Sequence, residues 1–511
     1  MLVKTYGSAV HGVNAILITV EVNIVTGVDY HLVGLPDSAI KESNLRIESA
    51  LKHVGLSMPR MKIVVNMAPA DIRKEGSAYD LTIAMGILAA SEQIPTDKLS
   101  TYLIMGELSL DGSLKAIRGA LPIAIEAKRR GFEGFILPMK NVREAAIVGG
   151  LKVYGMENIS EVVDFLKGEK VFAPYQLNTR DDFFSKLEDF DTDFSDVKGQ
   201  ENIKRAMEIA AAGGHNLILI GPPGAGKTML AKRLATILPP LSLNEALETT
   251  KLHSVAGKLK ASDALVSTRP FRAPHHTISD VALVGGGTFP QPGEISLAHN
   301  GVLFLDELPE FKRAVLEVMR QPLEERRVTI SRARFSIEYP ASFMLVASMN
   351  PCPCGYFNHP TKECSCKAGA VQSYISKVSG PLLDRIDIHV EVTPVAFTEL
   401  TDKRIEEKSA DIRMRVIKAR AIQSVRFKEN DLVHCNAQMN TKKVRSVCVI
   451  SEEGSQILKS AMERLGLSAR AYDRILKVAR TIADLEESND IKIEHLSEAI
   501  HYRSLDRDVW G

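Results

Sequence analysis

The sequence is poor in several features that mark special classes of protein. It has only six cysteines and one tryptophan in 511 residues, and it contains no low-complexity tract. Lysine and arginine number 64 against 63 aspartate and glutamate, which leaves a formal net charge of +1. No global field therefore draws the chain to DNA or to a membrane, and any nucleic-acid contact must come from a local patch or a channel.

Long apolar runs are missing as well. The first 22 residues have no continuous apolar signal core, because Glu21 interrupts their most apolar part. No later stretch reaches the roughly 18 uncharged apolar residues of a membrane-crossing helix. We therefore expect a cytoplasmic protein without a membrane partner, in a compartment where thiols stay reduced and disulfides are disfavoured.

The length predicts two or three domains of α/β character. Residues 1–170 have a mixed strand and helix pattern, and the polar, acidic residues 171–196 are interpreted as a linker. A second α/β domain is expected over 197–394. A charged helical region is expected over 395–511.

Alternation and apolar spacing predict individual elements inside these domains. β-branched residues alternate in two stretches, and apolar residues recur at helical spacing in two others. The elements expected are strands at 15–25 and 61–69, helices at 80–91 and 467–485, and a hairpin at 103–117 that turns at its Asp-Gly pair.

A glycine-rich loop stands between a short apolar strand and a helix. It fits the pattern G-x-x-x-x-G-K-[ST] with Gly221, Pro222, Pro223, Gly224, Ala225, Gly226, Lys227 and Thr228. The backbone N–H groups of such a P-loop curl around phosphates, the lysine reaches the β- and γ-phosphates, and the threonine hydroxyl binds Mg²⁺. A plain turn beside a surface lysine is the alternative. Because strand, loop and helix agree, we expect ATP and Mg²⁺ as cofactors.

Three further stretches end in polar residues that suit ATP hydrolysis. The apolar strand at 302–305 delivers Asp306, which suits Mg²⁺, and Glu307, which suits polarising the attacking water. Asn350 ends the apolar stretch before it, and Arg385 lies between two aspartates. These last two also have plain interpretations, as a strand cap and as one half of an Asp–Arg salt bridge.

The order of these blocks resembles an AAA+ ATPase of the magnesium-chelatase-like group, specifically the ComM/YifB competence-protein family. The similarity covers essentially the whole chain and is most specific at 269–287 and 292–311. The family fold would be an N-terminal Lon-protease-like α/β domain, a P-loop AAA+ core and a C-terminal helical lid.

The resemblance also assigns roles to single residues. It implies that Asn350 is the sensor-1 residue and that Arg385 is an arginine finger for a neighbouring subunit's nucleotide. It further implies that Arg470 is the sensor-2 arginine of the lid, with Arg474 as the alternative. A finger acting in trans completes each site only between subunits, so the resemblance implies a homo-oligomeric ring, usually of six subunits.

The substrate of such a motor is indicated by a predicted β-hairpin at 326–343. Its tip carries Arg332 and Arg334, which would contact DNA phosphates without recognising base sequence. A solvated hairpin tip is the alternative. We therefore expect single-stranded or branched DNA as a partner, with recombination proteins as further partners, and a helicase or branch-migration activity in recombination or natural transformation.

Two rival functions follow from the same resemblance. A chelatase motor would power metal insertion into a porphyrin, but such motors usually lack an N-terminal domain of this kind. An ATP-dependent protease would need a serine nucleophile and a lysine base. Ala78 and Leu121 stand at those two positions, and Ser77 is displaced by one residue. We expect the domain to be proteolytically inactive.

Four of the six cysteines lie between 350 and 366, in two Cys-x-Cys pairs. Four thiolates favour structural Zn²⁺, and the expected ligands are Cys352, Cys354, Cys364 and Cys366. Four plain thiols are the alternative, and His359 is a second-choice ligand. We expect this metal to anchor Asn350 and to lie far enough from the P-loop to leave nucleotide binding largely unaffected.

Overall fold

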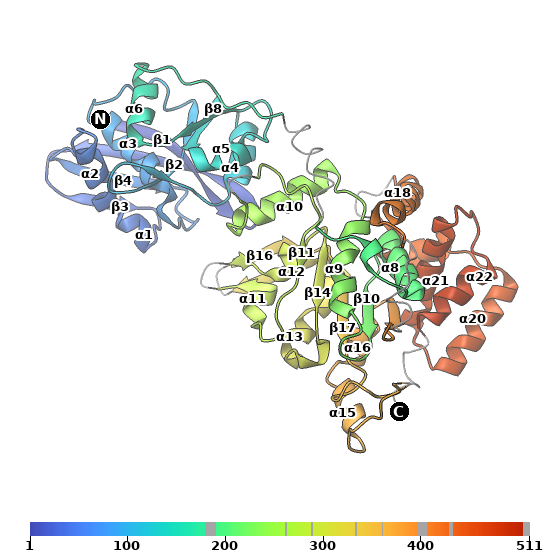
Figure 1. The fold of residues 1–511 in the computed structure, drawn as a ribbon. Coiled ribbons are helices and arrows are strands. Elements are labelled where there is room, and N and C mark those ends of the chain that lie inside the picture. The colour runs from blue at the N-terminus through green and yellow to red at the C-terminus, as the bar shows by residue number, and fades with distance from the viewer. Residues whose placement is uncertain are drawn as a thin grey trace. The chain divides into compact units, whose positions relative to one another are not determined.

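The computed structural model describes residues 1–178, 191–260, 263–287, 290–332, 335–359, 361–395, 406–428 and 433–503 (Figure 1). It divides into two compact units. Unit 1 comprises Met1–Leu187 together with Ser242–Ser267, and unit 2 comprises Glu188–Leu241 together with Thr268–Gly511. Each unit encloses its own hydrophobic core. None of the described helices combines the length and apolarity that crossing a bilayer requires.

Unit 1 is built on an antiparallel hairpin. β1 (Leu2–His11) pairs with β2 (Asn14–Val25), and β2 pairs with β4 (Lys62–Ala68). β3 (Tyr30–Val33) adds a parallel edge, giving the order β1-β2-β4-β3. Alternate residues of β4 are buried, as expected for a sheet with one face on the core. The strands predicted at 15–25 and 61–69 are confirmed.

Helix α3 (Asp80–Ala90) confirms the helix predicted at 80–91 and is buried along its whole length. It approaches β2 so closely that a Cβ at Gly86 would lie 2.6 Å from Cγ2 of Val22. A side chain at this position would push the helix off the sheet, so glycine is required here.

The hairpin predicted at 103–117 is shorter than expected. Only β6 (Glu107–Leu108) and β7 (Leu114–Lys115) pair antiparallel, with Gly112 at φ 82° in the turn. The preceding β5 (Tyr102–Ile104) instead joins a parallel sheet in the order β5-β8-β9. All three residues of β5 are buried, which is typical of a parallel strand.

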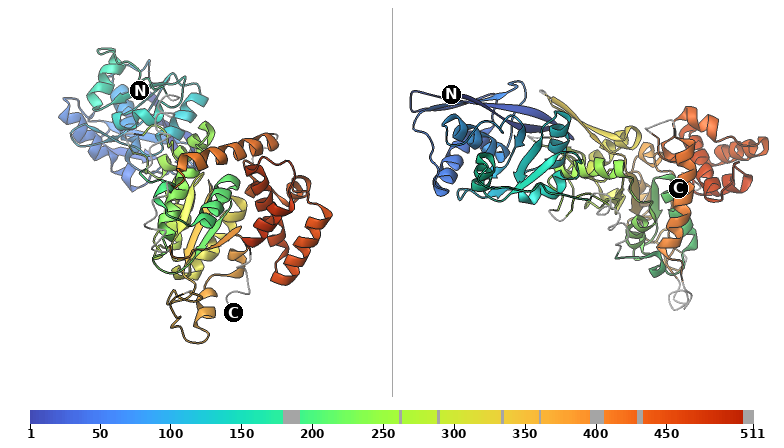
Figure 2. Two further views of the ribbon diagram at one scale, coloured as in Figure 1. Left: turned by 45° about the vertical axis from the view of Figure 1, so that its right-hand side comes forward. Right: turned by 90° about the horizontal axis from the view of Figure 1, so that it is seen from above.

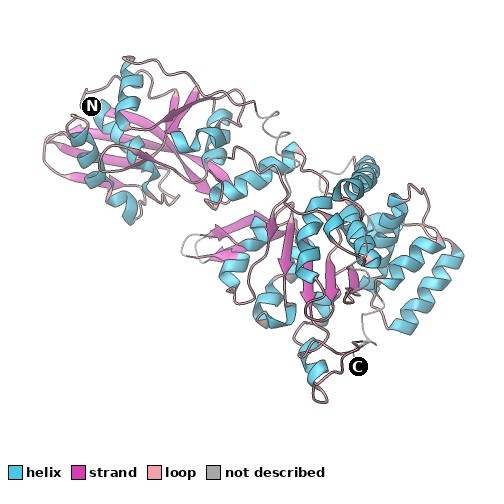
Figure 3. Ribbon diagram, viewed as in Figure 1, coloured by secondary structure: helices cyan, strands magenta, loops and turns pink. Residues whose placement is uncertain are grey.

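The remaining elements of unit 1 are helices and the other two strands of the parallel sheet, β8 and β9; Figure 3 colours helices and strands separately. They are α1 (Ser38–Lys41), α2 (Ser43–His53), α4 (Ala120–Arg129), β8 (Gly134–Pro138), α5 (Val142–Ala145), β9 (Lys152–Met156), α6 (Ile159–Lys167) and α10 (Leu243–Val255).

Helix α10 belongs to unit 1 although it follows the P-loop in sequence. It begins with a capping box of Ser242 and Glu245, and it packs on α4. The Ser254 hydroxyl donates to the carboxylate of Glu144, which also accepts from the backbone N–H of Leu121 at 2.8 Å. Burial raises the pKa of Glu144, and the Ser254 hydrogen bond opposes that shift. The sequence pattern does not separate this segment from the domain expected over 197–394.

Unit 2 contains a five-stranded parallel sheet with the order β11-β14-β17-β10-β18. Its central strands read as apolar runs and are fully buried, which is typical of a sheet covered on both faces. The strands are β10 (Leu217–Ile220), β11 (Phe271–Arg272), β14 (Val302–Leu305), β17 (Met344–Met349) and β18 (Ile388–Glu391).

Further strands and helices of unit 2 lie between residues 201 and 383. They are α8 (Glu201–Gly213), α9 (Lys227–Ile237), α11 (Asp280–Val284), β12 (Gly285–Gly286), β13 (Gln291–Pro292), α12 (Glu294–Leu297), α13 (Arg313–Val318), α14 (Arg320–Glu325), β15 (Arg327–Arg332), β16 (Phe335–Pro340), α15 (Ala370–Ile375) and α16 (Gly380–Leu383).

The C-terminal helices gather beside the parallel sheet of unit 2 (orange to red in Figure 2). They are α18 (Ser409–Arg426), α19 (Thr441–Val447), α20 (Glu452–Leu465), α21 (Ala469–Leu485) and α22 (Ile493–His501). Both α18 and α21 pack against α8, which joins this helical layer to the sheet. Helix α21 confirms the helix predicted at 467–485.

Candidate functional site

Three neighbouring strands deliver polar residues to one edge of the sheet in unit 2. The P-loop follows β10, Asp306 and Glu307 follow β14, and Asn350 follows β17. Strand β17 lies between β14 and β10, and all three are parallel. Since the carboxyl ends of parallel strands meet at one edge, residues far apart in sequence form a single site there.

Lys227 joins the P-loop to Asn350. Its amine donates to the carbonyls of Gly221 and Pro222 at 2.7 and 2.9 Å, and to Oδ1 of Asn350 at 2.9 Å. Burial lowers the pKa of Lys227, and the charges of Asp306 and Glu307 oppose that shift. An ammonium group half removed from water among neutral acceptors suits a polyphosphate ligand.

Thr228 and Asp306 form the second contact across the site. The Thr228 hydroxyl donates to Oδ2 of Asp306 at 2.6 Å. The Ser348 hydroxyl donates to the other carboxylate oxygen, Oδ1. A hydroxyl beside a carboxylate is the oxygen pair that Mg²⁺ takes in P-loop sites, so these residues fit the metal.

Ser348 is a site residue that sequence analysis missed. It lies inside β17 and is fully buried. A polar residue two positions before Asn350 in an apolar strand was the available signal. Its contact with Asp306 depends on the register between β14 and β17, which no local pattern gives.

Glu307 occupies a left-handed backbone conformation, with φ 54° and ψ 51°, directly after Asp306. Such a conformation is uncommon outside glycine and is often found at functional sites. Oε2 of Glu307 lies 3.7 Å from Nδ1 of His276, and the ring of His276 lies 4.0 Å from that of His275. The sequence pattern gives no signal for this contact of His276 with Glu307.

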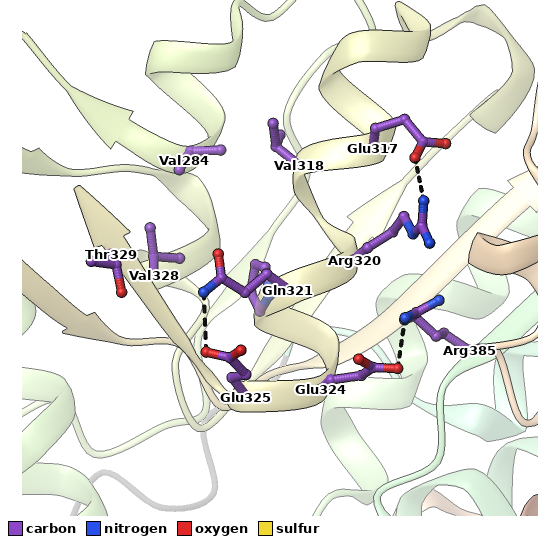
Figure 4. Close-up of a pocket in the computed structure, with 11 residues that line it drawn as sticks. Val284, Glu317, Val318, Arg320, Gln321, Glu324, Glu325, Val328, Thr329 and Arg385 are labelled. Carbon is purple, nitrogen blue, oxygen red and sulfur yellow. Dashed lines mark hydrogen bonds and ion pairs between the residues drawn. The ribbon is translucent and has the colours of Figure 1, made fainter. Parts of the chain in front are cut away.

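Arg385 lines a separate cavity of about 510 Å³ (Figure 4). Its guanidinium pairs with Glu324 of α14 at 2.6 Å rather than with either flanking aspartate, and it donates to the carbonyl of Pro381 at 2.5 Å. Its Nε has no hydrogen-bond partner among the described residues. Burial lowers the pKa of Arg385, although Glu324 opposes that shift.

The two arginines considered for sensor 2 have different surroundings. Arg470 is exposed in the first turn of α21, and its charge adds to the lowering of the Arg385 pKa. Arg474, one turn further, forms an ion pair with the buried Asp387. Although burial alone would raise the pKa of Asp387, Arg474 and His215 hold it well below its usual range. Arg474 is therefore engaged in an ion pair with Asp387 that links α21 to the residue before β18.

The predicted β-hairpin is present, and β15 pairs with β16 from Arg327 opposite Pro340 to Arg332 opposite Phe335. The tip residue Arg334 and the side chain of Arg332 lie outside the described residues. The structure therefore places the hairpin but not its arginine side chains.

The four cysteines of the loop after Asn350 come together. Their sulfur atoms all lie within 4.8 Å of one another. The Sγ of Cys352 lies 3.3 Å from that of Cys354 and 3.8 Å from that of Cys364, and the Cys354–Cys364 distance is 3.5 Å. Tetrahedral zinc with Zn–S bonds of about 2.3 Å places sulfur atoms about 3.8 Å apart, so the cluster fits zinc.

The cluster also has a hydrogen bond from the backbone. The N–H of Phe357 donates to the Sγ of Cys352 at 3.3 Å, and Cys352 is fully buried. This contact places a backbone donor on a buried sulfur atom of the cluster. Cys435 and Cys448 are also buried free thiols, but neither belongs to this group.

Unit 1 offers no serine–lysine pair at the positions expected for Lon-type chemistry. The hydroxyl of Ser77 donates to the carboxylate of Glu107. The nearby Lys74 is buried, and its amine donates to the carbonyl of Gly34 at 3.0 Å and to that of Pro69. Both side chains thus serve local structure.

Three family profiles match the chain. "Magnesium chelatase, subunit ChlI" matches residues 193–400, "Subunit ChlI of Mg-chelatase" matches 20–141, and "Magnesium chelatase, subunit ChlI C-terminal" matches 406–503. The fold and the site of unit 2 therefore define a magnesium-chelatase-like AAA+ protein with a helical C-terminal region.

The similarity to individual proteins is closer still. Competence protein ComM of Haemophilus influenzae is 43% identical over 510 residues, covering 99% of this chain and 98% of that protein. YifB of Escherichia coli, an uncharacterised protein, is 44% identical over 499 residues, or 97% and 96% of the two chains. Lon protease 2 of Bacillus subtilis is 33% identical over 159 residues, 28% of this chain and 27% of that protein. The chain belongs to the magnesium-chelatase-like ComM/YifB family.

Proposed function

We propose that the chain is a Mg²⁺-dependent ATPase that acts as a ring-forming motor on DNA. The observation that carries the ATPase is the pair of contacts across the strand ends: Lys227 with Asn350, and Thr228 with Asp306. These residues would hold ATP and Mg²⁺, with Asp306 near the metal and Glu307 polarising the attacking water.

DNA as the substrate is supported by two features. Arg332 ends β15, and Arg334 follows two positions later in the sequence; their guanidinium groups would bind phosphates. The full-length relative from Haemophilus influenzae is named a competence protein, and competence concerns the uptake of DNA. We infer a helicase or branch-migration activity in recombination or natural transformation.

A ring, with six subunits expected, would complete each site between neighbours. Arg385 lines the cavity of unit 2 and pairs with Glu324, and among the described contacts it has none with Lys227. In the trans role its guanidinium would leave Glu324 for the next subunit's nucleotide, and its Nε has no partner among the described residues. Arg470 would assist from the lid.

We further propose that the four-cysteine cluster holds Zn²⁺ in a structural role. Four sulfur ligands leave no open coordination position, so the metal would supply no chemistry to ATP hydrolysis. Unit 1 would be a Lon-protease-like module without proteolytic activity, because Ala78 and Leu121 stand at the positions of the nucleophile and the base, and the displaced Ser77 donates to Glu107.

ATPase activity with and without forked or Holliday-type DNA tests this function. Wild-type protein should hydrolyse ATP faster with branched DNA. Glu307→Gln should bind ATP but turn over about 10²–10⁴-fold more slowly, because the water loses its base. Arg332→Ala/Arg334→Ala should weaken DNA binding and leave basal turnover intact. Full turnover by Glu307→Gln would refute the ATPase assignment.

The rival functions and the ring are tested by the same preparation. A chelatase motor would ignore DNA and respond to porphyrin-binding partner subunits, and a protease would degrade an unfolded protein.

For the ring, inactive Arg385→Ala mixed with inactive Lys227→Ala should regain ATPase activity, since each variant supplies the residue that the other lacks. Absence of rescue in rings shown to be mixed would exclude a finger acting in trans.

A further inference from the structure

The loop that carries the cysteine cluster touches the P-loop. A Cβ built at Gly355 would lie 2.5 Å from Cδ and 3.2 Å from Cγ of Pro223, the third residue of the P-loop. The backbone of Gly355 therefore lies directly against the proline ring. The sequence-based expectation that this loop is distant from the P-loop is wrong, because the loop follows β17 and the P-loop follows β10, and these two strands are paired neighbours.

The same excursion of the chain returns to the site at a second point. Tyr374 of α15 is buried, and its hydroxyl interacts with the backbone N–H of Asn350. Burial raises the pKa of Tyr374 to about 12, so the hydroxyl stays neutral. The loop thus begins at Asn350, contacts Pro223 and then contacts Asn350 again.

The cysteines fix the position of Gly355. It directly follows Cys354, and its N–H donates to the carbonyl of Cys352 at 3.0 Å. Gly355 itself has φ +84°, a conformation that favours glycine. Since Cys352 and Cys354 both belong to the sulfur cluster, whatever holds the cluster together also sets where Gly355 presses on the proline.

We propose that the cysteine cluster positions the P-loop through the Gly355–Pro223 contact, so that metal in the cluster strengthens nucleotide binding. Gly355 is then a positioning residue, acting through Pro223 on the backbone N–H groups that receive phosphate. The physical reason is preorganisation: a loop held in its bound shape loses less conformational freedom when the nucleotide arrives. This inference rests on the proposed nucleotide and zinc sites.

Two glycines of this region make a matched pair of variants. Gly369 has φ +77°, close to that of Gly355, but a Cβ built there meets nothing within 4 Å. Gly355→Ala and Gly369→Ala therefore share the strain of a side chain at positive φ. Only Gly355→Ala adds a clash with the P-loop. The difference between the two variants isolates the contact.

The measurement is the Kd for ADP with Mg²⁺ by titration calorimetry, with zinc content and circular dichroism recorded for each protein. Gly355→Ala should weaken ADP binding at least tenfold, and Gly369→Ala should stay within twofold of wild type. Equal affinities for the two variants, with both folded, would overturn the positioning role.

The metal link is tested separately by removing zinc from the wild-type protein with a chelator and then restoring it. Verified loss of zinc should weaken ADP binding at least tenfold, and added Zn²⁺ should restore it. Unchanged affinity after zinc loss would overturn the metal link. Protein purified without chelator that carries less than about a tenth of an equivalent of zinc would overturn it too, because a four-cysteine site survives purification. In that case the glycine pair still decides whether Gly355 positions the P-loop, and ADP binding by the wild type decides the nucleotide site.

Discussion

The ion pair between Arg474 and Asp387 gives a sharp test of which lid arginine is structural. Asp387 is 2% exposed, and its other partners are the ring of His215 at 3.3 Å and the backbone N–H of Asn216 at 3.1 Å. Burial lowers the pKa of His215, so that ring contributes a neutral donor. Replacing Arg474 by methionine keeps most of the packing but leaves the carboxylate without its main counter-charge.

Breaking one side of a buried ion pair costs about 3–5 kcal/mol. Two neutral donors remain on Asp387, so we expect a loss near the lower end, about 3 kcal/mol, for Arg474→Met. The exposed Arg470 is the matched control on the same helix face, and Arg470→Met should change stability by less than about 0.5 kcal/mol.

Urea unfolding followed by circular dichroism measures both changes, and ATP turnover is recorded beside it. Arg470→Met should lower turnover and keep stability, whereas Arg474→Met should lose stability. In the double variant Asp387→Asn/Arg474→Met the two losses should be clearly less than additive, since both remove one interaction. An Arg474→Met protein within about 1 kcal/mol of wild type, but without ATP turnover, would refute the structural role of Arg474.

Two further predictions concern histidines. His276→Ala should lower kcat about tenfold and leave the Kd for ADP unchanged, because His276 contacts Glu307 and none of the P-loop residues among the described contacts. His276→Asn should recover part of the rate. An altered Kd for ADP would contradict this role. Burial, with the charge of Arg503, lowers the pKa of His389 to about 3. The folded state therefore holds His389 neutral while the unfolded chain takes up a proton below about pH 6.5, so stability should fall as pH drops from about 6.5 towards 3, by up to about 1.4 kcal/mol per pH unit. His389→Gln should flatten that slope in urea unfolding at pH 7 and 5.5, and an unchanged slope would contradict the assignment.

Local pattern predicts the parts of this protein that local physics determines. Sequence pattern alone predicts the P-loop, the strands that end at Asp306 and Asn350, and helix α21. Their signals, the alternation of buried residues and the spacing of motif residues, lie within a few positions of each other. The four cysteines are predictable as a cluster for the same reason, since they lie on one short loop.

The contacts that complete the site depend on neighbours in space. Ser348 reaches Asp306 only through the register of two parallel strands. Glu324 pairs with Arg385 because α14 lies beside it, although two aspartates are far closer in sequence. The contact between Gly355 and Pro223 depends on the path of an irregular loop, which the spacing of apolar residues does not predict.

The assignment of α10 to unit 1 has a topological consequence. The chain passes between the units three times, at residues 187/188, 241/242 and 267/268. A single proteolytic cut at any one crossing therefore leaves the other two crossings intact, and a fragment ending at residue 187 lacks the Ser254 hydroxyl that Glu144 accepts from. The second crossing, at 241/242, also limits how far apart two helix ends can move. Helix α9, which begins at Lys227, ends at Ile237, and α10 has its N-cap at Ser242. Five residues span at most about 18 Å, so the far end of the P-loop helix can move only that distance from the start of a helix anchored in unit 1.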